Sequence, residues 1–349
     1  AWIGASIGLD YWQVDAWATW FVAFVLYDLC YYWLHRISHE RQLLWAAHVA
    51  HHQSEEYNLS TALRQTSTGF LFGWIFYIPL FLLGIPPEVI VSVGAVNLIY
   101  QFWVHTRHVP ELGWLEYVFI TPSNHRVHHA QNDCYVDKNY GGVFIVWDRL
   151  FGTYQPELAD TPCIYGIRGP LQSWSPWRAL THIYVDMLHD IRQAASWRER
   201  WQVLIARTGW QPGSIPEAAR RQKNDLSQFH VYDPAVASAR RVYGGLQILG
   251  ATLVLLWAQL QVLNGIQAWL IFILLLWTGV ATAWWLEGRA GAHILIFDLA
   301  RLASIAVFTW VHAADALWGT LLGLWWISSL AFLMTSVAAR KWQWNGGET

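Results

Sequence analysis

The chain has 349 residues, of which 55% are hydrophobic and only 13% are charged. Soluble domains usually carry about 25% charged residues, so the composition is typical of a membrane protein. The formal net charge of −2 gives no reason to expect a nucleic acid partner. Three cysteines do not form a disulfide framework, which favours a reducing compartment. The chain starts at Ala1 rather than at a methionine, so we expect that residues and further spans can precede it.

Three apolar stretches in the first third of the chain predict membrane helices at about 16–34, 69–84 and 88–105. A membrane-spanning helix needs about 20 mainly apolar residues, and the second and third stretches are short for this. They therefore predict a tilted or partly inserted hairpin. The residues between them, Gly84-Ile85-Pro86-Pro87, are of the types that end helices.

A polar segment at 113–241 follows and predicts a helical cap outside the membrane. Within it, Trp177–Ile205 has Trp, Leu and Ile on one side and Arg on the other, which predicts one or two amphipathic helices. Such helices can lie in the membrane interface, where their apolar face is buried among lipids. A helix packed on the polar cap explains the same pattern equally well.

The last part of the chain is apolar again and predicts four membrane spans. Asp298 and Arg301, one helical turn apart, are expected to neutralise each other inside the bundle. His312 and Asp315 are further ionisable residues here, interpreted more readily as span-end or packing residues than as a site. The predicted spans lie near 245–263, 267–286, 292–312 and 317–338.

The sequence thus predicts an all-α, multi-pass integral membrane protein with two domains. Residues 1–240 are expected to form a domain with three membrane helices and the cap, and residues 244–339 a four-helix transmembrane bundle. Short loops rich in Lys and Arg usually face the cytoplasm. The loops after the first and third apolar stretches carry such residues, so we expect them and the cap to be cytoplasmic. These residues are Arg36, Arg41, Arg64, Arg107 and Arg126.

Eight of the fifteen histidines fall in three compact groups near the predicted membrane boundary. Residues three and four apart share a face of a helix, so each group is expected to aim its imidazoles at one point. Three such groups together are poorly explained as solvated surface histidines. The groups are an H-x-x-x-H of His35 and His39, an H-x-x-H-H of His48, His51 and His52, and an H-x-x-H-H of His125, His128 and His129.

The number and type of these ligands indicate the chemistry of the site. Imidazole suits iron, zinc, copper and nickel. Catalytic zinc sites use about three protein ligands and structural sites four, so eight histidines are too many for one ion and suit two. Two metals held by neutral ligands favour dioxygen chemistry. A zinc-dependent membrane hydrolase and a metal transporter are the alternatives, although a transporter is expected to carry its histidines inside the spans.

The histidine groups and their surroundings resemble the fatty acid hydroxylase/sterol desaturase superfamily over about residues 25–155. Longer strings are similar to the alkylglycerol monooxygenase family within it, whereas the last four spans match only as a hydrophobic bundle. The strings are H-R-x-S-H-E at 35–40, H-H-Q-S-E-E-Y-N-L-S-T-A-L-R-Q at 51–65, Q-F-W-V-H-T at 101–106, T-P-S-N-H-R-V-H-H at 121–129 and D-K-N-Y-G-G-V-F-I-V-W-D-R-L-F-G-T-Y at 137–154.

The resemblance implies a di-iron monooxygenase in which the eight histidines bind two iron ions and His105 is a ninth ligand. His108, three residues later, is expected to be a bystander. The implied reaction uses O2 to hydroxylate the carbon beside the ether oxygen of an alkylglycerol, which releases a fatty aldehyde, and the implied reductant is tetrahydrobiopterin. The residues leave open a sterol, fatty acyl or carotenoid substrate, with electrons from a redox partner.

Two acidic residues are candidates for supporting the metal site from outside. Glu40 follows the first histidine group and is interpreted either as an acceptor for an imidazole N–H or as an exposed loop acid. Asp148 is expected to support the site together with Asn139 and Tyr140, for which turn and packing roles are equally open. Arg64 and Gln65 were further candidates, for contact with a polar headgroup or a cofactor.

Overall fold

The structure is a computed structural model that describes residues 12–289, 291–311 and 316–345. Across these ranges the chain forms helices, turns and two isolated bridges but no β-strand, which confirms the predicted all-α fold. The chain divides into two compact units, and we describe each by itself. One contains Ala1–Leu171 and Leu180–Val231, and the other contains Gln172–Ala179 and Tyr232–Thr349.

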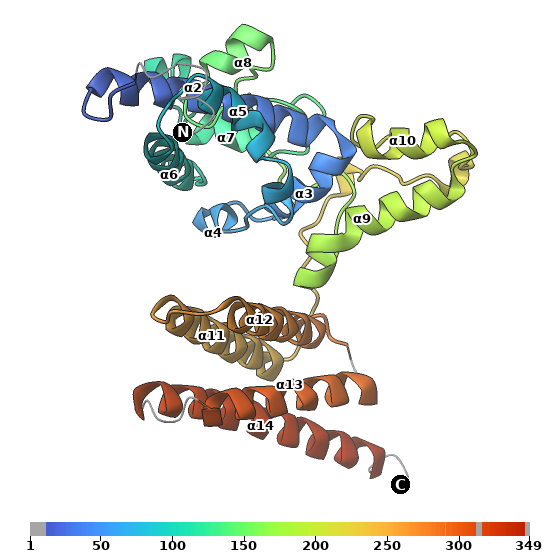
Figure 1. The fold of residues 1–349 in the computed structure, drawn as a ribbon. Helices are drawn as coiled ribbons and strands as arrows, with labels where there is room; N and C mark the ends of the chain where they lie inside the picture. Colours follow the sequence, from blue (N-terminus) through green and yellow to red (C-terminus); the bar gives the residue numbers. More distant parts are fainter. Residues whose placement is uncertain (1–11, 290, 312–315, 346–349) are drawn as a thin grey trace. The chain divides into compact units, whose positions relative to one another are not determined.

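The first unit is built around α2 (Trp17–Glu40), which packs against α3 (Gln42–His52), α5 (Trp74–Leu82) and α6 (Pro87–Trp103) (Figure 1). The break between α5 and α6 falls at the predicted turn, where Gly84 has a φ of 78° that suits glycine. Pro86 directly precedes α6 and Pro87 is its first residue, a position where a missing N–H breaks no helical hydrogen bond.

α2 continues beyond the predicted span as far as Glu40 and carries His35 and His39 on its last two turns. Four of the described helices are long and apolar enough to cross a membrane, and α2 is not among them. Its tryptophans and tyrosines and the buried Asp28 reduce its hydropathy below that of a typical span. The short apolar helix at Gly69–Leu82 is likewise not long enough.

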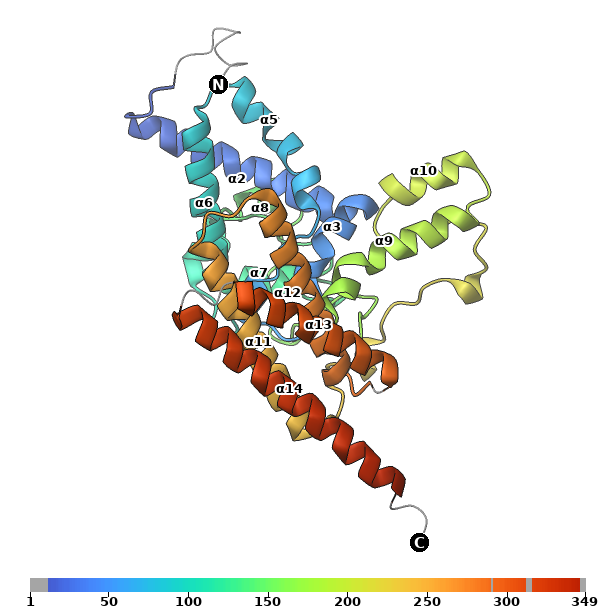
Figure 2. The ribbon, with the colours of Figure 1, turned by 60° about the horizontal axis from the view of Figure 1, so that its bottom comes forward.

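The polar segment of the first unit forms short helices and two longer ones. Within that segment, α9 (Pro176–Gln193) and α10 (Trp197–Ile205) lie side by side in both ribbon views, and Met187, Val203 and Ala46 share a small apolar core (Figure 2). The sequence therefore predicted two amphipathic helices correctly. The remaining short elements of the first unit, inside and outside this segment, are α4 (Leu59–Ala62), η1 (Gly69–Leu71), η2 (Gly113–Tyr117), α7 (Pro122–His128), α8 (Val146–Phe151), η3 (Glu217–Ala219) and η4 (Leu226–Gln228).

The second unit is a four-helix bundle in which each helix packs on the next and the first also packs on the last. All four helices are long and apolar enough to span a membrane, as the apolar stretches predicted. His312 and Asp315 lie outside the described residues. The helices are α11 (Ser238–Gln259), α12 (Gly265–Leu286), α13 (Ala292–Val311) and α14 (Ala316–Asn345).

The predicted pairing of Asp298 with Arg301 is confirmed, since Arg301 Nε donates to Asp298 Oδ1 at 2.6 Å and both side chains are fully buried. Tyr243 and Trp285 donate to the same carboxylate, and Gln247 accepts from the guanidinium. A buried ion pair is stable only when such hydrogen bonds satisfy its remaining donors and acceptors. This network therefore joins α11, α12 and α13 through polar contacts in the middle of an apolar bundle.

We expect Arg301→Leu to destabilise the bundle by about 3–5 kcal/mol, because it leaves the Asp298 carboxylate buried without its cation. The measurement is thermal unfolding in detergent, followed by circular dichroism. Arg241→Leu is the control, since it removes an exposed arginine of α11, and surface substitutions usually change stability by about 0.5 kcal/mol or less. Equal effects of the two substitutions would contradict the prediction.

Candidate metal centre

Nine buried or half-buried histidines of the first unit converge on two points, and in each group the nitrogens that could bind a metal lie within 4.8 Å of one another. We call the two sets group A and group B. All nine histidines predicted as ligands are in these groups. Group A contains His35, His39, His48, His52 and His128, and group B contains His51, His105, His125 and His129.

Each H-x-x-H-H motif is divided between the two groups, which corrects the expectation that each motif aims at one point. On α3, His48 and His52 are four residues apart and enter group A, whereas His51, turned by about 100° from the adjacent His52, enters group B. At α7 the division is reversed: His125 and His129 enter group B and His128 enters group A. Each motif thus contributes histidines to both groups.

Four histidines have their Nδ1 atoms held by backbone carbonyls, at 2.7–3.0 Å. The acceptors are Tyr140 O for His35, Arg64 O for His51, Gln101 O for His105 and Lys138 O for His128. A carbonyl oxygen can only accept, so in each neutral ring the proton is on Nδ1 and the lone pair is on Nε2. This tautomer directs Nε2 to the centre of each group, as the outer partners of metal ligands usually do.

The arrangement of lone pairs fits a bound cation. His51 Nε2 and His105 Nε2 lie 3.3 Å apart although both rings donate through Nδ1, so two lone pairs face each other. The buried His128 Nε2 has no hydrogen-bond partner. Other Nε2 pairs lie 3.0–3.2 Å apart, close to the spacing of about 3 Å between neighbouring nitrogens at about 2.1 Å from one ion. A metal in each group would relieve this repulsion.

Burial keeps these imidazoles neutral. It lowers the pKa of His51 to about 4 and that of His35 to about 3, because a charged ring loses its hydration in the interior. Burial and neighbouring histidines also lower the pKa of His39, His48 and His52 well below the ordinary value. A metal would therefore meet deprotonated ligands and would not have to displace protons at neutral pH.

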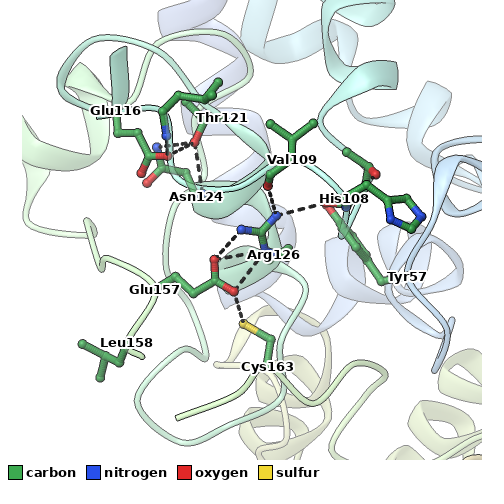
Figure 3. Close-up of polar contacts among 12 residues, drawn as sticks. Tyr57, His108, Val109, Glu116, Thr121, Asn124, Arg126, Glu157, Leu158 and Cys163 are labelled. Carbon is green, nitrogen blue, oxygen red and sulfur yellow. Dashed lines mark hydrogen bonds and ion pairs between the residues drawn. The ribbon is translucent and has the colours of Figure 1, made fainter. Parts of the chain in front are cut away.

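His105 and His108 differ as predicted in where the structure places them. His105 is buried and belongs to group B, and its Nε2 lies 3.0 Å from His125 Nε2. His108 lies exposed in the following loop and belongs to neither group. Figure 3 shows His108 near Arg126, with its ring directed away from the guanidinium.

Arg126 supports the segments around group B. From the sequence, this residue was used only to predict the orientation in the membrane. Its guanidinium donates to both carboxylate oxygens of Glu157, at 2.7–3.0 Å, and to the carbonyls of Thr106 and Val109 (Figure 3). Arg126 follows His125 directly, and Thr106 follows His105. The arginine therefore fixes the two segments that supply these group B histidines relative to each other.

Asp148 acts on group A through the turn at 137–141. Its carboxylate accepts from Tyr140 N at 2.7 Å, Gly141 N at 2.8 Å and Thr153 Oγ1 at 2.6 Å. Tyr140 O in turn accepts from His35, so Asp148 is a positioning residue one step removed from the ligand. Burial raises the pKa of Asp148 to about 6, whereas the three donors favour its charged form.

The buried amide of Asn139 holds the same turn, since it donates to Asn124 O and Gln155 O. Asn139 has a φ of 55°, a conformation that Asn tolerates better than most residues. The carbonyl of the preceding Lys138 accepts from His128. The turn therefore presents two carbonyls, those of Lys138 and Tyr140, to group A histidines.

Asp28 is a further support that the sequence reading left without a role. Its buried carboxylate accepts from Val143 N, Phe144 N, Trp147 Nε1 and Asn97 Nδ2, at 2.7–3.0 Å. It thereby ties α2 and α6 to the segment before α8. An acidic residue in the middle of an apolar helix was the signal that could have identified it.

Glu40 is the last residue of α2 and is half-buried. Its carboxylate accepts from Arg36 Nε at 2.9 Å, and its other charged neighbour is Arg207 at 3.7 Å. The four histidines described above bind backbone carbonyls through Nδ1 and do not bind this acid. Of the two residues considered for a headgroup or a cofactor, Arg64 donates to Ala50 O and Gln53, whereas Gln65 lines a cavity beside the histidines.

That cavity has a volume of about 210 Å³ and borders both histidine groups. His35 and His48 of group A and His51 and His105 of group B line it together. The rest of its wall is mainly apolar, with a few polar side chains. It is therefore a compartment in which an apolar molecule can approach both candidate metal positions. The other lining residues are Tyr31, Leu34, Ser38, Leu44, Ala47, Ala62, Gln65, Thr66, Gly69, Leu98, Gln101 and Phe102.

Comparison with known proteins agrees with this site. Residues 20–153 match the family model described as fatty acid hydroxylase, and this segment contains all nine histidines. The segment that forms both histidine groups therefore belongs to the fatty acid hydroxylase family. The similarity to individual members extends further along the chain than the family model does.

The chain is 42% identical to the alkylglycerol monooxygenase of Danio rerio, over 67% of this chain and 52% of the relative. It is 43% identical to that of Homo sapiens, over 56% of this chain and 43% of the relative. Ornithine lipid hydroxylase OlsE of Rhizobium tropici is 32% identical over 42% of this chain and 44% of its own length. The chain thus spans about half the length of the first relatives. No solved structure matches it significantly.

We expect purified protein to bind two metal ions per chain and His105→Ala to lower this number, because group B would keep only three ligands. His108→Ala is the matched control and should keep both ions, since its ring is exposed outside the groups. The measurement is elemental analysis by mass spectrometry. Loss of metal in the His108 variant with full retention in the His105 variant would reverse the assignment.

We expect Asp148→Asn to weaken metal binding up to about 10-fold, the lower end of the effect of removing a direct outer partner of a ligand, because Asp148 acts through the Tyr140 peptide. An amide oxygen cannot accept from all three donors as a carboxylate does, so the Tyr140 carbonyl should shift away from His35. Metal release to a chelator measures this change. Asp160→Asn, at an exposed acid, is the control, and unchanged release in the Asp148 variant would refute the positioning role.

Proposed function

We propose that the protein is a membrane-bound di-iron monooxygenase that hydroxylates the carbon next to the ether oxygen of an alkylglycerol. The observation that carries this proposal is the pair of buried histidine groups beside one largely apolar cavity. The similarity to alkylglycerol monooxygenases, over the segment that contains these groups, supports the ether lipid as substrate. Within this proposal all nine histidines are iron ligands.

Iron is the metal whose chemistry suits the proposal. Imidazole ligands suit iron. Zinc usually binds such ligands more tightly than iron does, so it can replace iron during expression. Two bound irons would supply the activation of O2. One oxygen atom enters the C–H bond and the other leaves as water, which requires two electrons and two protons from a reductant. The product is a hemiacetal that separates into a fatty aldehyde and a glycerol.

The protein's own residues contribute binding, orientation and exclusion of water. The carbonyls of Tyr140 and Gln101 fix the rings of His35 and His105, so the ligand geometry exists before the metal binds. The apolar side chains of the cavity, among them Leu34 and Phe102, would keep water from the reacting carbon. Asp148 and Arg126 hold the surrounding segments in place.

We further propose that the reductant is a tetrahydrobiopterin-type pterin, on the basis of the likeness to alkylglycerol monooxygenases. The first unit would be the catalytic domain and the four-helix bundle the main membrane anchor, in accord with predicted domains at 1–240 and 244–339. The active site would face the cytoplasm, since Arg36, Arg41 and Arg64 follow the first helix and such loops usually remain inside.

A second candidate is a hydroxylase of another lipid with electrons from a redox protein. The similarity to an ornithine lipid hydroxylase and, at 27% identity, to a methylsterol monooxygenase of Rattus norvegicus favours this alternative. A zinc hydrolase is a third reading, and iron in protein purified without added metal would argue against it.

We expect iron-loaded protein in detergent to release fatty aldehyde from an alkylglycerol when O2 and reduced pterin are present. Omission of O2 or pterin should abolish the product, and His128→Ala should do the same because it removes a group A ligand. Aldehyde is detected by trapping with a hydrazine. Hydroxylation of a sterol or acyl chain with a ferredoxin-type donor, without aldehyde, would favour the second candidate.

A further inference from the structure

A second hollow adjoins the histidine cavity on the side of α2, α5 and α6. This groove, which we call the tail groove, has a volume of about 470 Å³ and is lined mainly by apolar and aromatic side chains. It lies wholly within the first unit. Its lining residues are Tyr27, Tyr31, Trp74, Tyr77, Phe81, Ile90, Val91, Gly94, Ala95, Asn97, Leu98 and Gln101.

The cavity and the tail groove share three lining residues, Tyr31, Leu98 and Gln101. These residues form the boundary between the two spaces. The cavity side carries histidines and the polar residues Gln65 and Thr66, whereas the groove side carries mostly aromatic and aliphatic groups. A ligand lying across the boundary would therefore meet polar groups at one end and an apolar surface at the other.

A ladder of hydrogen bonds crosses this boundary, and the Asp28 carboxylate fixes its direction. Asp28 can only accept, so Asn97 donates to it at 2.7 Å and turns its oxygen towards Gln101. Gln101 donates to that oxygen at 2.6 Å and presents its own oxygen to Tyr31, which donates at 2.7 Å. The boundary thus ends in the Tyr31 hydroxyl and the second N–H of the Gln101 amide.

We propose that the tail groove holds the alkyl chain of the lipid and that the Gln101 amide, oriented by Tyr31, recognises the ether oxygen at the start of that chain. This inference rests on the proposed function and adds to it the orientation of the substrate. The glycerol end would lie in the cavity near Gln65 and Thr66. The carbon beside the ether oxygen would then lie at the boundary, next to the histidines.

The ladder leaves one donor for the substrate. Tyr31 donates its single hydroxyl hydrogen to Gln101 Oε1, and Gln101 donates one N–H to Asn97, so the second N–H of the Gln101 amide is the donor that faces the substrate. An ether oxygen can accept from this N–H and has no hydrogen of its own to place. An all-carbon chain would leave the N–H without a partner, which is unfavourable for polar groups away from water.

The position of the tail is tested by photo-crosslinking, which requires no catalysis. The probe is an alkylglycerol with a diazirine near the end of a hexadecyl chain, and labelled peptides are mapped by mass spectrometry. Label on α5 and α6 residues of the tail groove is expected. Ala95→Phe fills the groove and should reduce this labelling at least fivefold, whereas Val96→Phe, at an exposed neighbour outside the groove, should not.

The role of the pair is tested by competition for the same probe, between an alkylglycerol and the diol in which CH2 replaces the ether oxygen. Tyr31→Phe should reduce the preference for the ether about 2- to 10-fold, the usual effect of one hydrogen bond, because the Gln101 amide loses the partner that orients its N–H. Tyr27→Phe is the control, since Tyr27 lies on the same helix and lines only the groove. A general loss of folding would weaken both ligands equally.

The outcomes separate this inference from the proposed function. Label outside the tail groove, or an Ala95→Phe variant that labels like Val96→Phe, would overturn the position of the tail even if aldehyde is formed. An unchanged ether preference in Tyr31→Phe would overturn the role of the pair. Groove labelling without aldehyde formation would instead support the orientation and contradict the reaction.

Discussion

The first unit depends on the burial of neutral imidazoles whose lone pairs face one another. An unpaired polar group in the interior is costly, and nine histidines directed inwards with few donors among them would repel one another. Burial lowers their pKa values, so protonation does not relieve the repulsion at neutral pH. A cation in each group does relieve it. The two groups therefore form a candidate metal cage because of their tautomers as well as their residue types.

The cage is held by an outer frame of backbone carbonyls and buried carboxylates. Tyr140 and Lys138 present carbonyls to group A, and the turn that carries them is fixed by Asp148 and Asn139. Asp28 fixes the segment that follows and also sets the direction of the ladder to Tyr31. The frame therefore connects the metal position to the wall of the lipid cavity.

Periodicity and residue type were enough to predict much of this. The i, i+3 and i+4 spacing identified eight of the nine histidines that converge, and the family resemblance added His105. The apolar stretches identified the four helices of the second unit. Spacing alone could not divide each H-x-x-H-H motif between two groups, because that division depends on where the other helices lie. The first predicted span, 16–34, belongs to a longer helix whose last turns carry ligands.

Sequence reasoning missed the supports because their partners are distant along the chain or are backbone atoms. Asp28 binds the amides of Val143 and Phe144, more than a hundred residues away. Arg126 had a visible charge, but its partner Glu157 carries no motif. Glu40 was a candidate because it adjoins a histidine in sequence, and on the last turn of α2 its carboxylate accepts from Arg36.

The distribution of ligands along the chain also explains why similarity is concentrated where it is. The nine histidines lie between His35 and His129. The turn at 137–141, together with Asp148 and Thr153, which hold it, also lies within the family match at 20–153. The bundle contributes no histidine to either group among its described residues. Metal geometry constrains the first segment residue by residue, whereas a membrane bundle needs only apolar helices and satisfied polar groups. The second unit can therefore vary in sequence while the metal cage stays the same.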